Sequence, residues 1–223
     1  MFKKTPYLIN MAFFSETELK QISEGEKTDL CDIMNAYGSD KGNGHHNYTK
    51  LYSRMFESIR DKPLNILEIG IGTINPNLVS SMCGIPNYKP GASHRGWRDY
   101  FRNSMIYGCD IDKNIIDFGT EPRIKGFYID QRDKHNILDT FFFGELKDVK
   151  FDIIVDDGLH NFNVNFSIMC ILMNKLNENG IYIIEDICDF NNKEVPFKYP
   201  YQYICLPNPR NNADNNLFIA KKT

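Results

Sequence analysis

The sequence contains no closely spaced cysteine pair, no long apolar run and no marked excess of one charge sign. Its six cysteines are scattered among 223 residues, at positions 31, 83, 109, 170, 188 and 205. Without a CxxC pair we expect neither a zinc site nor a disulfide framework, but reduced thiols in a cytoplasmic protein. No apolar stretch approaches the roughly 20 residues of a membrane helix, so no membrane insertion is expected. The formal net charge of −3 gives no electrostatic reason to expect nucleic acid as a partner.

The first residues, MFKKTPYLINMAFF, have some features of a signal peptide. Pro6 and Asn10 interrupt the apolar run, however, and no small-residue cleavage site follows. We therefore expect an arm that packs on the domain or on a partner subunit.

Two nucleotide-binding signatures are also missing. A glycine turn, Glu68-Ile-Gly-Ile-Gly72, follows an expected strand. The dinucleotide fingerprint would need a third glycine where this chain has Asn75. No Gly-Lys-Ser/Thr follows, which excludes a phosphate-binding P-loop. Gly70 and Gly72 therefore predict close approach of the backbone to a ligand other than NAD.

Residues 151–187 show the clearest pattern in the chain. Phe151 to Val155 is typical of a strand buried on both faces, and apolar residues at helical spacing follow over 162–176. We expect Asn179-Gly180 to cap that helix and 181–184 to form the next strand. Both strands end in acidic residues, and ligands of open α/β sheets bind at the carboxyl ends of the strands.

The other apolar runs predict alternating strands and helices. Strands are expected at 64–69, 105–109, 125–129, 151–155, 181–184, 201–206 and 216–221, and helices from 15, at 30–37, 48–59, 75–81, 97–103, 133–143 and 162–176. This order predicts an α/β, doubly wound, seven-stranded, mainly parallel sheet with a C-terminal antiparallel hairpin. We expect one structural domain overall, with an arm and helices at 1–60 packed on a core at 61–223.

A polar loop, YGSDKGNGHH, separates two of the N-terminal helices. One interpretation is a plain connection between helices. The other is a lid or substrate loop that brings Lys41, His45 or His46 to the site.

An acid at the end of the second strand, Asp110 or Asp112, stands where a ribose diol would be held. Its two oxygens suit two hydroxyls. A ligand with a ribose but without a pyrophosphate fits these features, which points to S-adenosylmethionine.

The motifs together resemble a known family. LEIGIG, GASHRGWRDYF, YGCDID, IDQRD, VDDGLH and YIIEDI follow one another along the chain. The set resembles class I S-adenosylmethionine-dependent methyltransferases, which have a Rossmann-like fold. More narrowly, it is similar to the macrocin-type sugar O-methyltransferases that modify deoxysugars of antibiotics. The segment YGSDKG…HHNYTKLY is similar to methyltransferases of bacterial surface-sugar biosynthesis, and the whole resemblance covers roughly residues 37–221.

The resemblance implies roles for the residues near the cofactor. Glu68 and the two glycines of the turn would line its methionine part. Asp110 and Asp112 would face the ribose, with Asp110 preferred because it lies nearer the strand end. Asp130 and Gln131 would lie near the adenine, although they also suit a helix-start cap.

A metal site is predicted at the two acidic strand ends. Asp157, Glu185 and Asp186 follow neighbouring strands, whose ends lie about 4.8 Å apart. Carboxylates this close repel one another, and a hard cation such as Mg²⁺, or Mn²⁺, relieves the repulsion. The separation of Asp157 from Glu185, 185 − 157 = 28 residues, matches the metal site of the family. We expect Asp156 to support the turn or to face the cofactor.

A chemical role follows for His160. A metal that chelates two neighbouring sugar oxygens lowers the pKa of one hydroxyl, and His160 then acts as general base, with Asp157 beside it. The plainer interpretations are a turn with a helix cap and a solvated histidine. The family usually has Ser and a second His where this chain has Leu159 and Val164, which affects secondary contacts and the pose of the substrate.

The leading hypothesis is therefore a metal-dependent O-methyltransferase acting on a sugar. We expect a nucleotide-activated sugar, such as a heptose or deoxysugar, in capsule or surface-glycan biosynthesis. One alternative is a metal-independent N- or O-methyltransferase of small molecules; another is a non-catalytic cofactor-binding subunit. A homo-oligomer is expected, because members of the family are commonly oligomeric and the apolar arm suits an interface.

Overall fold

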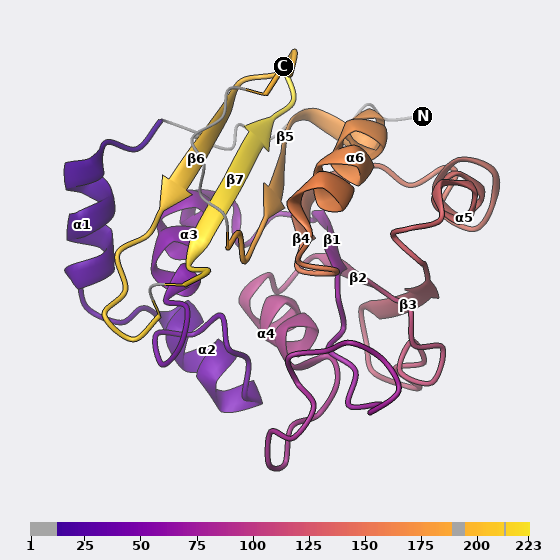
Figure 1. Ribbon diagram of the computed structural model, residues 1–223, viewed down its shortest axis with the longest axis horizontal. Helices are drawn as coiled ribbons and strands as arrows, with labels where there is room; N and C mark the ends of the chain where they lie inside the picture. The colour runs from indigo at the N-terminus through magenta and orange to yellow at the C-terminus, as the bar shows by residue number, and fades with distance from the viewer. Residues whose placement is uncertain (1–12, 189–194, 212) are drawn as a thin grey trace.

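A seven-stranded sheet organises the computed structural model, which describes residues 13–188, 195–211 and 213–223 (Figure 1). Its strands are β1 Asn65–Ile69, β2 Met105–Asp110, β3 Ile124–Tyr128, β4 Phe151–Asp156, β5 Leu176–Ile184, β6 Tyr201–Cys205 and β7 Asn216–Lys221. They lie in the order β3-β2-β1-β4-β5-β7-β6, and β7 is antiparallel to both β5 and β6. The remaining pairs are parallel. The predicted mainly parallel sheet with a terminal hairpin is thus confirmed, whereas residues 1–12 of the expected arm lie outside the described part.

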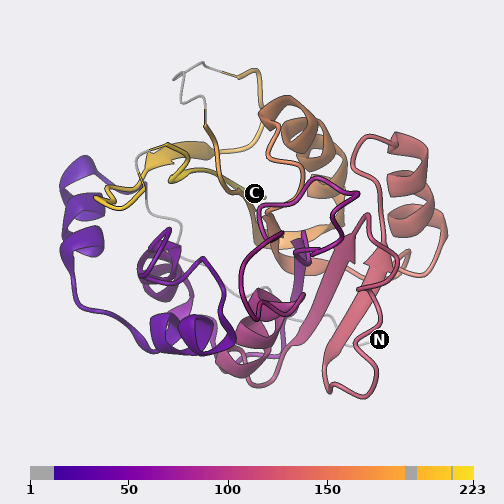
Figure 2. The ribbon, with the colours of Figure 1, turned by 60° about the horizontal axis from the view of Figure 1, so that its bottom comes forward.

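Helices cover both faces of the sheet (Figure 2). They are α1 Glu16–Glu24, α2 Asp29–Tyr37, α3 Tyr48–Phe56, α4 Ala92–Tyr100, α5 Lys134–Leu138 and α6 Phe162–Leu172, with short turns η1 Glu57–Ile59, η2 Asp139–Phe143 and η3 Met173–Lys175. Helices α1 to α4 contribute to one apolar core and α6 to the other. No helix of the described chain is long and apolar enough to span a membrane.

The alternation of side chains along each strand explains why both faces are covered. On β4, Ile153 belongs to the core under α3 and α4, whereas Ile154 belongs to the core under α6. Ile66 and Leu67 of β1 divide in the same way. Each of these four side chains is at most 1% exposed. A strand with apolar residues on both faces must be buried on both, as the continuous apolar runs of the sequence predict.

The N-terminal helices lie next to the C-terminal hairpin (Figures 1 and 2). Ser15 caps α1 through the predicted capping box. Gln202 of β6 hydrogen-bonds the backbone of Phe14 in both directions. Asn47 Nδ2 donates to Pro207 O, just beyond the hairpin strand β6. These contacts position the loop between α2 and α3 at the carboxyl ends of the strands.

Two of the predicted local structures are wrong. Residues 75–81 form turns instead of a helix, because Thr73 Oγ1 and Asn75 Oδ1 accept from backbone N–H groups two residues on. Asn179 does not cap α6, which ends at Leu172. It has a φ of +64° within β5, at an irregularity of the β4–β5 pairing.

Candidate active site

A cavity of about 180 Å³ opens where the strand order reverses between β1 and β4. Such a switch point is where open α/β sheets bind ligands. The residues predicted for the site that line this cavity are Gly70, Gly72, Asp110, Asp130, Gln131, Asp157 and His160. Glu68, Asp112 and Asp156 do not line it.

The glycine turn needs both of its glycines. Gly70 has a φ of +101° and Gly72 a φ of +83°, in the region that side chains rarely adopt. A Cβ on Gly70 would collide with the carbonyl oxygen of Asp157, and one on Gly72 with the hydroxyl of Tyr88. The turn therefore presents bare backbone to the cavity, as predicted.

The structure distinguishes between the two candidate ribose acids. Asp110 accepts hydrogen bonds from the backbone N–H groups of Ile71 and Asp112, both at 2.8 Å, while still lining the cavity. Burial raises the pKa of Asp110. Asp112 instead accepts from Thr73 Oγ1 at 2.5 Å and from the side chain of Asn114. Asp110 is thus the carboxylate available to a ligand.

Asp156 supports the turn after β4 and does not line the cavity. It is fully buried and accepts hydrogen bonds from Gln131 Nε2, Asn165 Nδ2 and Tyr182 Oη at 2.8 to 3.0 Å. Burial raises its pKa to about 6. Gln131 Oε1 in turn accepts from the backbone of Leu159, so Gln131 ties the turn after β4 to the end of β3.

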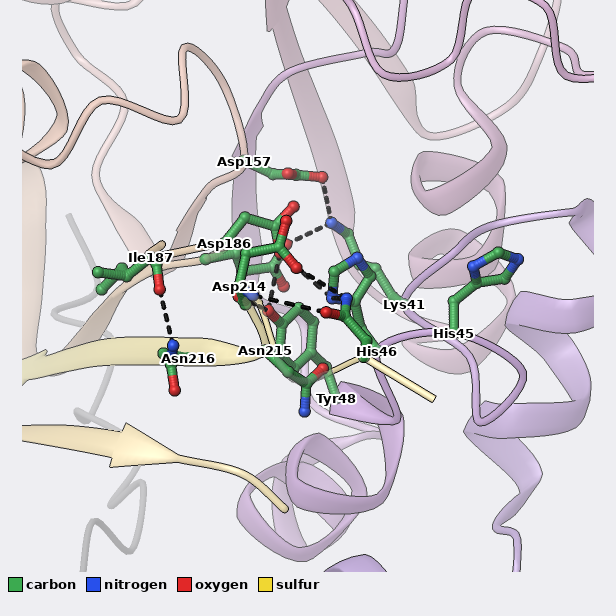
Figure 3. Close-up of polar contacts among 12 residues, drawn as sticks. Lys41, His45, His46, Tyr48, Asp157, Asp186, Ile187, Asp214, Asn215 and Asn216 are labelled. Atoms are coloured by element: carbon green, nitrogen blue, oxygen red, sulfur yellow. Dashed lines mark hydrogen bonds and ion pairs between the residues drawn. The ribbon is translucent and has the colours of Figure 1, made fainter. Parts of the chain in front are cut away.

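The acidic residues at the ends of β4 and β5 converge, as predicted, but they meet a lysine (Figure 3). Lys41 Nζ pairs with Asp157 Oδ2 and Glu185 Oε2, and lies 3.1 Å from Glu68 Oε1. The remaining oxygen of Glu185 accepts from Tyr52 Oη. Glu68 thus faces Lys41 and does not line the cavity between β1 and β4.

The cluster that suits a metal differs from the prediction in one residue. Ligand atoms of Asp157, His160 and Asp186 lie within 4.8 Å of one another. His160 Nε2 is 3.0 Å from Asp157 Oδ1 and 3.6 Å from Asp186 Oδ2. Glu185 is not part of this group in the structure, where Lys41 and Tyr52 hold its two oxygens. The two carboxylates fit Mg²⁺ or Mn²⁺ in donor chemistry, which leaves the imidazole of His160 beside the cation site and not required as a ligand.

His160 has a strained backbone conformation and a raised pKa. His160 and Asp186 have φ of +53° and +55°, strained values that non-glycine residues adopt mainly where the fold or function requires them. Burial alone would lower the pKa of His160. The hydrogen bond with Asp157 and the charges of Asp157 and Asp186 outweigh burial and raise it to about 9.

The loop between α2 and α3 reaches the site, which excludes a plain connection. Figure 3 shows Lys41 and His46 directed toward the acidic cluster, whereas His45 points away. His46 Nδ1 is 3.5 Å from Asp186 Oδ1. Lys41 is only 1% exposed, so it is not a lysine on an open substrate loop.

Two tyrosines of the site were missed by sequence reasoning. Tyr48 Oη donates to Asp186 Oδ1 at 2.7 Å, and Tyr52 Oη donates to Glu185. Both lie in the helix predicted at 48–59, where their rings suit an apolar face. Their hydroxyl groups, one turn apart on that face, were the available signal.

A second cavity, of about 340 Å³, lies on the other side of His160. The residues lining it include His160, Asn161, Phe162, Asn163, Asn165, Glu185, Asp186 and Tyr203. Among the described residues, His160 alone lines both cavities. The two cavities therefore adjoin at His160.

No protein-family model matches the chain. It is 33% identical over 161 residues to the 8-demethyl-8-alpha-L-rhamnosyl tetracenomycin-C 2'-O-methyltransferase of Streptomyces olivaceus, covering 71% of this chain and 37% of that protein. It is 32% identical over 163 residues to the demethylmacrocin O-methyltransferase of Streptomyces fradiae, covering 72% and 37%. The chain is a homologue of sugar O-methyltransferases.

A solved structure agrees with this relationship. The MycE methyltransferase of the mycinamycin biosynthetic pathway, solved in complex with Mg, SAH and mycinamycin VI, has a TM-score of 0.57 and 28% identity. The match covers 79% of this chain and 49% of MycE. The resemblance to the class I sugar O-methyltransferases and their fold is thereby confirmed. The chain spans little more than a third of the length of the curated relatives that it matches.

Proposed function

We propose that this protein transfers a methyl group from S-adenosylmethionine to a hydroxyl group of a sugar, assisted by Mg²⁺ or Mn²⁺. The observation that carries the proposal is the place of His160 between the two cavities. A base that removes the hydroxyl proton must lie within hydrogen-bond reach of the acceptor oxygen, while that oxygen faces the methyl group of the donor, so a residue that lines both cavities suits the role. The homology to sugar O-methyltransferases supports the same reaction.

The first cavity suits the donor. Asp110 would accept hydrogen bonds from the two ribose hydroxyls. The backbone at Gly70 and Gly72 would lie against the methionine part, and Asp130 and Gln131 would lie near the adenine. Bound there, S-adenosylmethionine supplies an electrophilic methyl group. Asp130 is held by Arg132 at 2.9 Å, which fixes its carboxylate at the edge of the cavity.

The second cavity suits a sugar. Aromatic rings of Phe162 and Tyr203, with centroids 5.8 Å apart, offer an apolar wall for the C–H face of a sugar ring. Three asparagines supply amide groups for its hydroxyls. Asn165 is fully buried, and its Oδ1 accepts no hydrogen bond from the described residues. A hydroxyl of the acceptor, or a water held beside it, would satisfy that oxygen.

The carboxylates at the ends of β4 and β5 suit a divalent cation. A divalent cation would be held by Asp157 and Asp186. Glu185 would join them in competition with Lys41. Such a cation supplies Lewis-acid activation of the acceptor hydroxyl. It would also oppose the negative charge that raises the pKa of His160, and so favour the neutral imidazole that takes the proton.

The acceptor is proposed as a sugar joined through its anomeric carbon to another group. A nucleotide-activated sugar of capsule or surface-glycan assembly is the narrower proposal, supported by the resemblance of residues 37–52. The curated relatives are instead named for antibiotic sugars and aglycones. Both acceptor classes carry neighbouring hydroxyls that a chelating site would recognise.

The test is a screen of nucleotide sugars and glycosylated macrolides with S-adenosylmethionine and Mg²⁺ or Mn²⁺, followed by mass spectrometry. We expect a mass gain of one methylene on a sugar of one class. Binding of SAH without turnover on any acceptor would instead support the non-catalytic alternative. A rate unchanged by EDTA would support the metal-independent alternative.

A further inference from the structure

Lys41 occupies the centre of the acidic cluster, although it comes from the far N-terminal part of the chain. Its ammonium pairs with three carboxylates near the carboxyl ends of three different strands: Glu68 within β1, Asp157 just after β4 and Glu185 just after β5. The lysine side chain is 2% exposed and Glu68 and Glu185 are at most 1% exposed. The methyl-transfer chemistry described above assigns no role to this lysine.

The burial of this group makes its contacts significant. An exposed lysine–carboxylate pair contributes little, but removal of one partner from a buried set leaves uncompensated charge. The backbone fixes the position of Lys41, since its carbonyl accepts from Thr49 N at 3.1 Å and its N–H donates to Ser39 Oγ. The loop therefore inserts one positive charge among three negative ones.

The oxygens of the cluster are divided between Lys41 and other donors. Asp157 gives Oδ2 to Lys41 and Oδ1 to His160. Glu185 gives Oε2 to Lys41 and Oε1 to Tyr52. A divalent cation that uses Asp157 and Glu185 together must take oxygen atoms that now face the ammonium.

We propose that Lys41 is the internal counter-ion of the metal site. It holds Asp157 and Glu185 in place before a divalent cation binds, and its charge opposes the binding of that cation. The proposal rests on the proposed function only in taking this cluster as the metal site. Lys41 is thus a positioning residue, which keeps the site assembled and sets its affinity for metal.

Thermal melting and cation titration of Lys41→Met test this. In EDTA, we expect the variant to melt lower than wild type by on the order of 10 °C, because two buried carboxylates and the half-buried Asp157 lose their counter-ion. Mg²⁺ should remove most of that deficit. In calorimetric titration with Mn²⁺, the variant should bind the ion about tenfold more tightly or better, because a neighbouring positive charge is gone.

Two further variants separate charge from packing. Lys50→Met is the matched control. Within the described part of the chain, Lys50 Nζ donates to the backbone carbonyls of Ser23 and Gly25 and not to the acidic cluster, so the cation affinity of this variant should equal that of wild type. The pair Lys41→Met with Glu185→Gln removes one charge of each sign, and should melt higher in EDTA than Lys41→Met alone.

Three results would overturn the proposal. They are melting of Lys41→Met in EDTA at the wild-type temperature, Mn²⁺ affinity that is unchanged, weaker or undetectable in the variant, and a double variant no more stable than the single one. None of these measurements involves an acceptor or methyl transfer. Failure of the methyltransferase assay therefore leaves the proposal about Lys41 standing. Failure of the Lys41 measurements likewise leaves the proposed methyl transfer standing.

Discussion

Tyr48 Oη donates a hydrogen bond to Asp186 Oδ1 at 2.7 Å and so joins the start of α3 to the end of β5, 138 residues along the chain. His46 stacks on the Tyr48 ring, with centroids 4.8 Å apart, and faces the same carboxylate oxygen. The N-terminal segment thus completes the acidic site and does more than cover the sheet.

Tyr48→Phe should destabilise the protein by about 1.5–3 kcal/mol, because it removes a buried hydrogen bond to a charged group. The free carboxylate oxygen should also make Asp186 less well positioned, and kcat should fall. Urea unfolding and initial rates measure both effects. Tyr100→Phe, on α4 and outside the site, is the control for kcat. Wild-type stability together with a wild-type rate in Tyr48→Phe would contradict the assigned role of this contact.

His160→Gln should lower kcat by about 10²- to 10⁴-fold, since general-base catalysis contributes on this scale. Asp157→Ala should likewise abolish turnover. Both variants should still bind SAH, because Asp110 and the glycine turn remain intact. Calorimetry with SAH and methyl-transfer rates make this comparison. His135→Gln, on α5, is the control, and equal rates in His160→Gln and wild type would exclude His160 as the base.

Gly70→Ala should weaken SAH binding and destabilise the fold by more than the roughly 1–2 kcal/mol that a left-handed backbone costs a side chain. The excess comes from the collision with the Asp157 carbonyl oxygen. Gly84→Ala is the matched control, because Gly84 has a φ of +87° but a Cβ there meets nothing within 4 Å. Equal losses in the two variants would show that backbone strain alone decides the effect. Denaturant unfolding and SAH titration give the two values.

Asn163→Ala should raise KM for the sugar several-fold while the affinity for SAH stays the same. Asn163 is exposed and lines only the second cavity, so the fold should tolerate the change. Loss of one hydrogen bond at a partly open site corresponds to about 0.5–1.5 kcal/mol. Asn174→Ala, in η3, provides the comparison. A changed SAH affinity with an unchanged KM would argue against the second cavity as the acceptor site.

Local patterns in the sequence were sufficient for most of the fold. Continuous apolar runs predicted strands such as β4, because residues that must be buried on both faces leave no polar alternation. The segment 75–81 was not predictable in this way, since Thr73 and Asn75 draw the backbone into turns. Asn179 was predicted to cap a helix, but a residue with left-handed backbone suits a bulge in a strand equally well. Only the pairing of β4 with β5 distinguishes the two structures.

The sequence by itself determined the kind of site, with glycines at one strand end, acids at the neighbouring strand ends and a histidine beside them. These residues come directly after the apolar runs that mark each strand, so their place at the edge of the sheet can be predicted. Only the tertiary structure decided how those groups are paired. Contacts of Lys41 with Asp157 and Glu185 join positions 116 and 144 residues apart, and no local periodicity specifies such contacts. They arise because the loop before α3 is folded over the strand ends, which places one buried ammonium where carboxylates alone were expected.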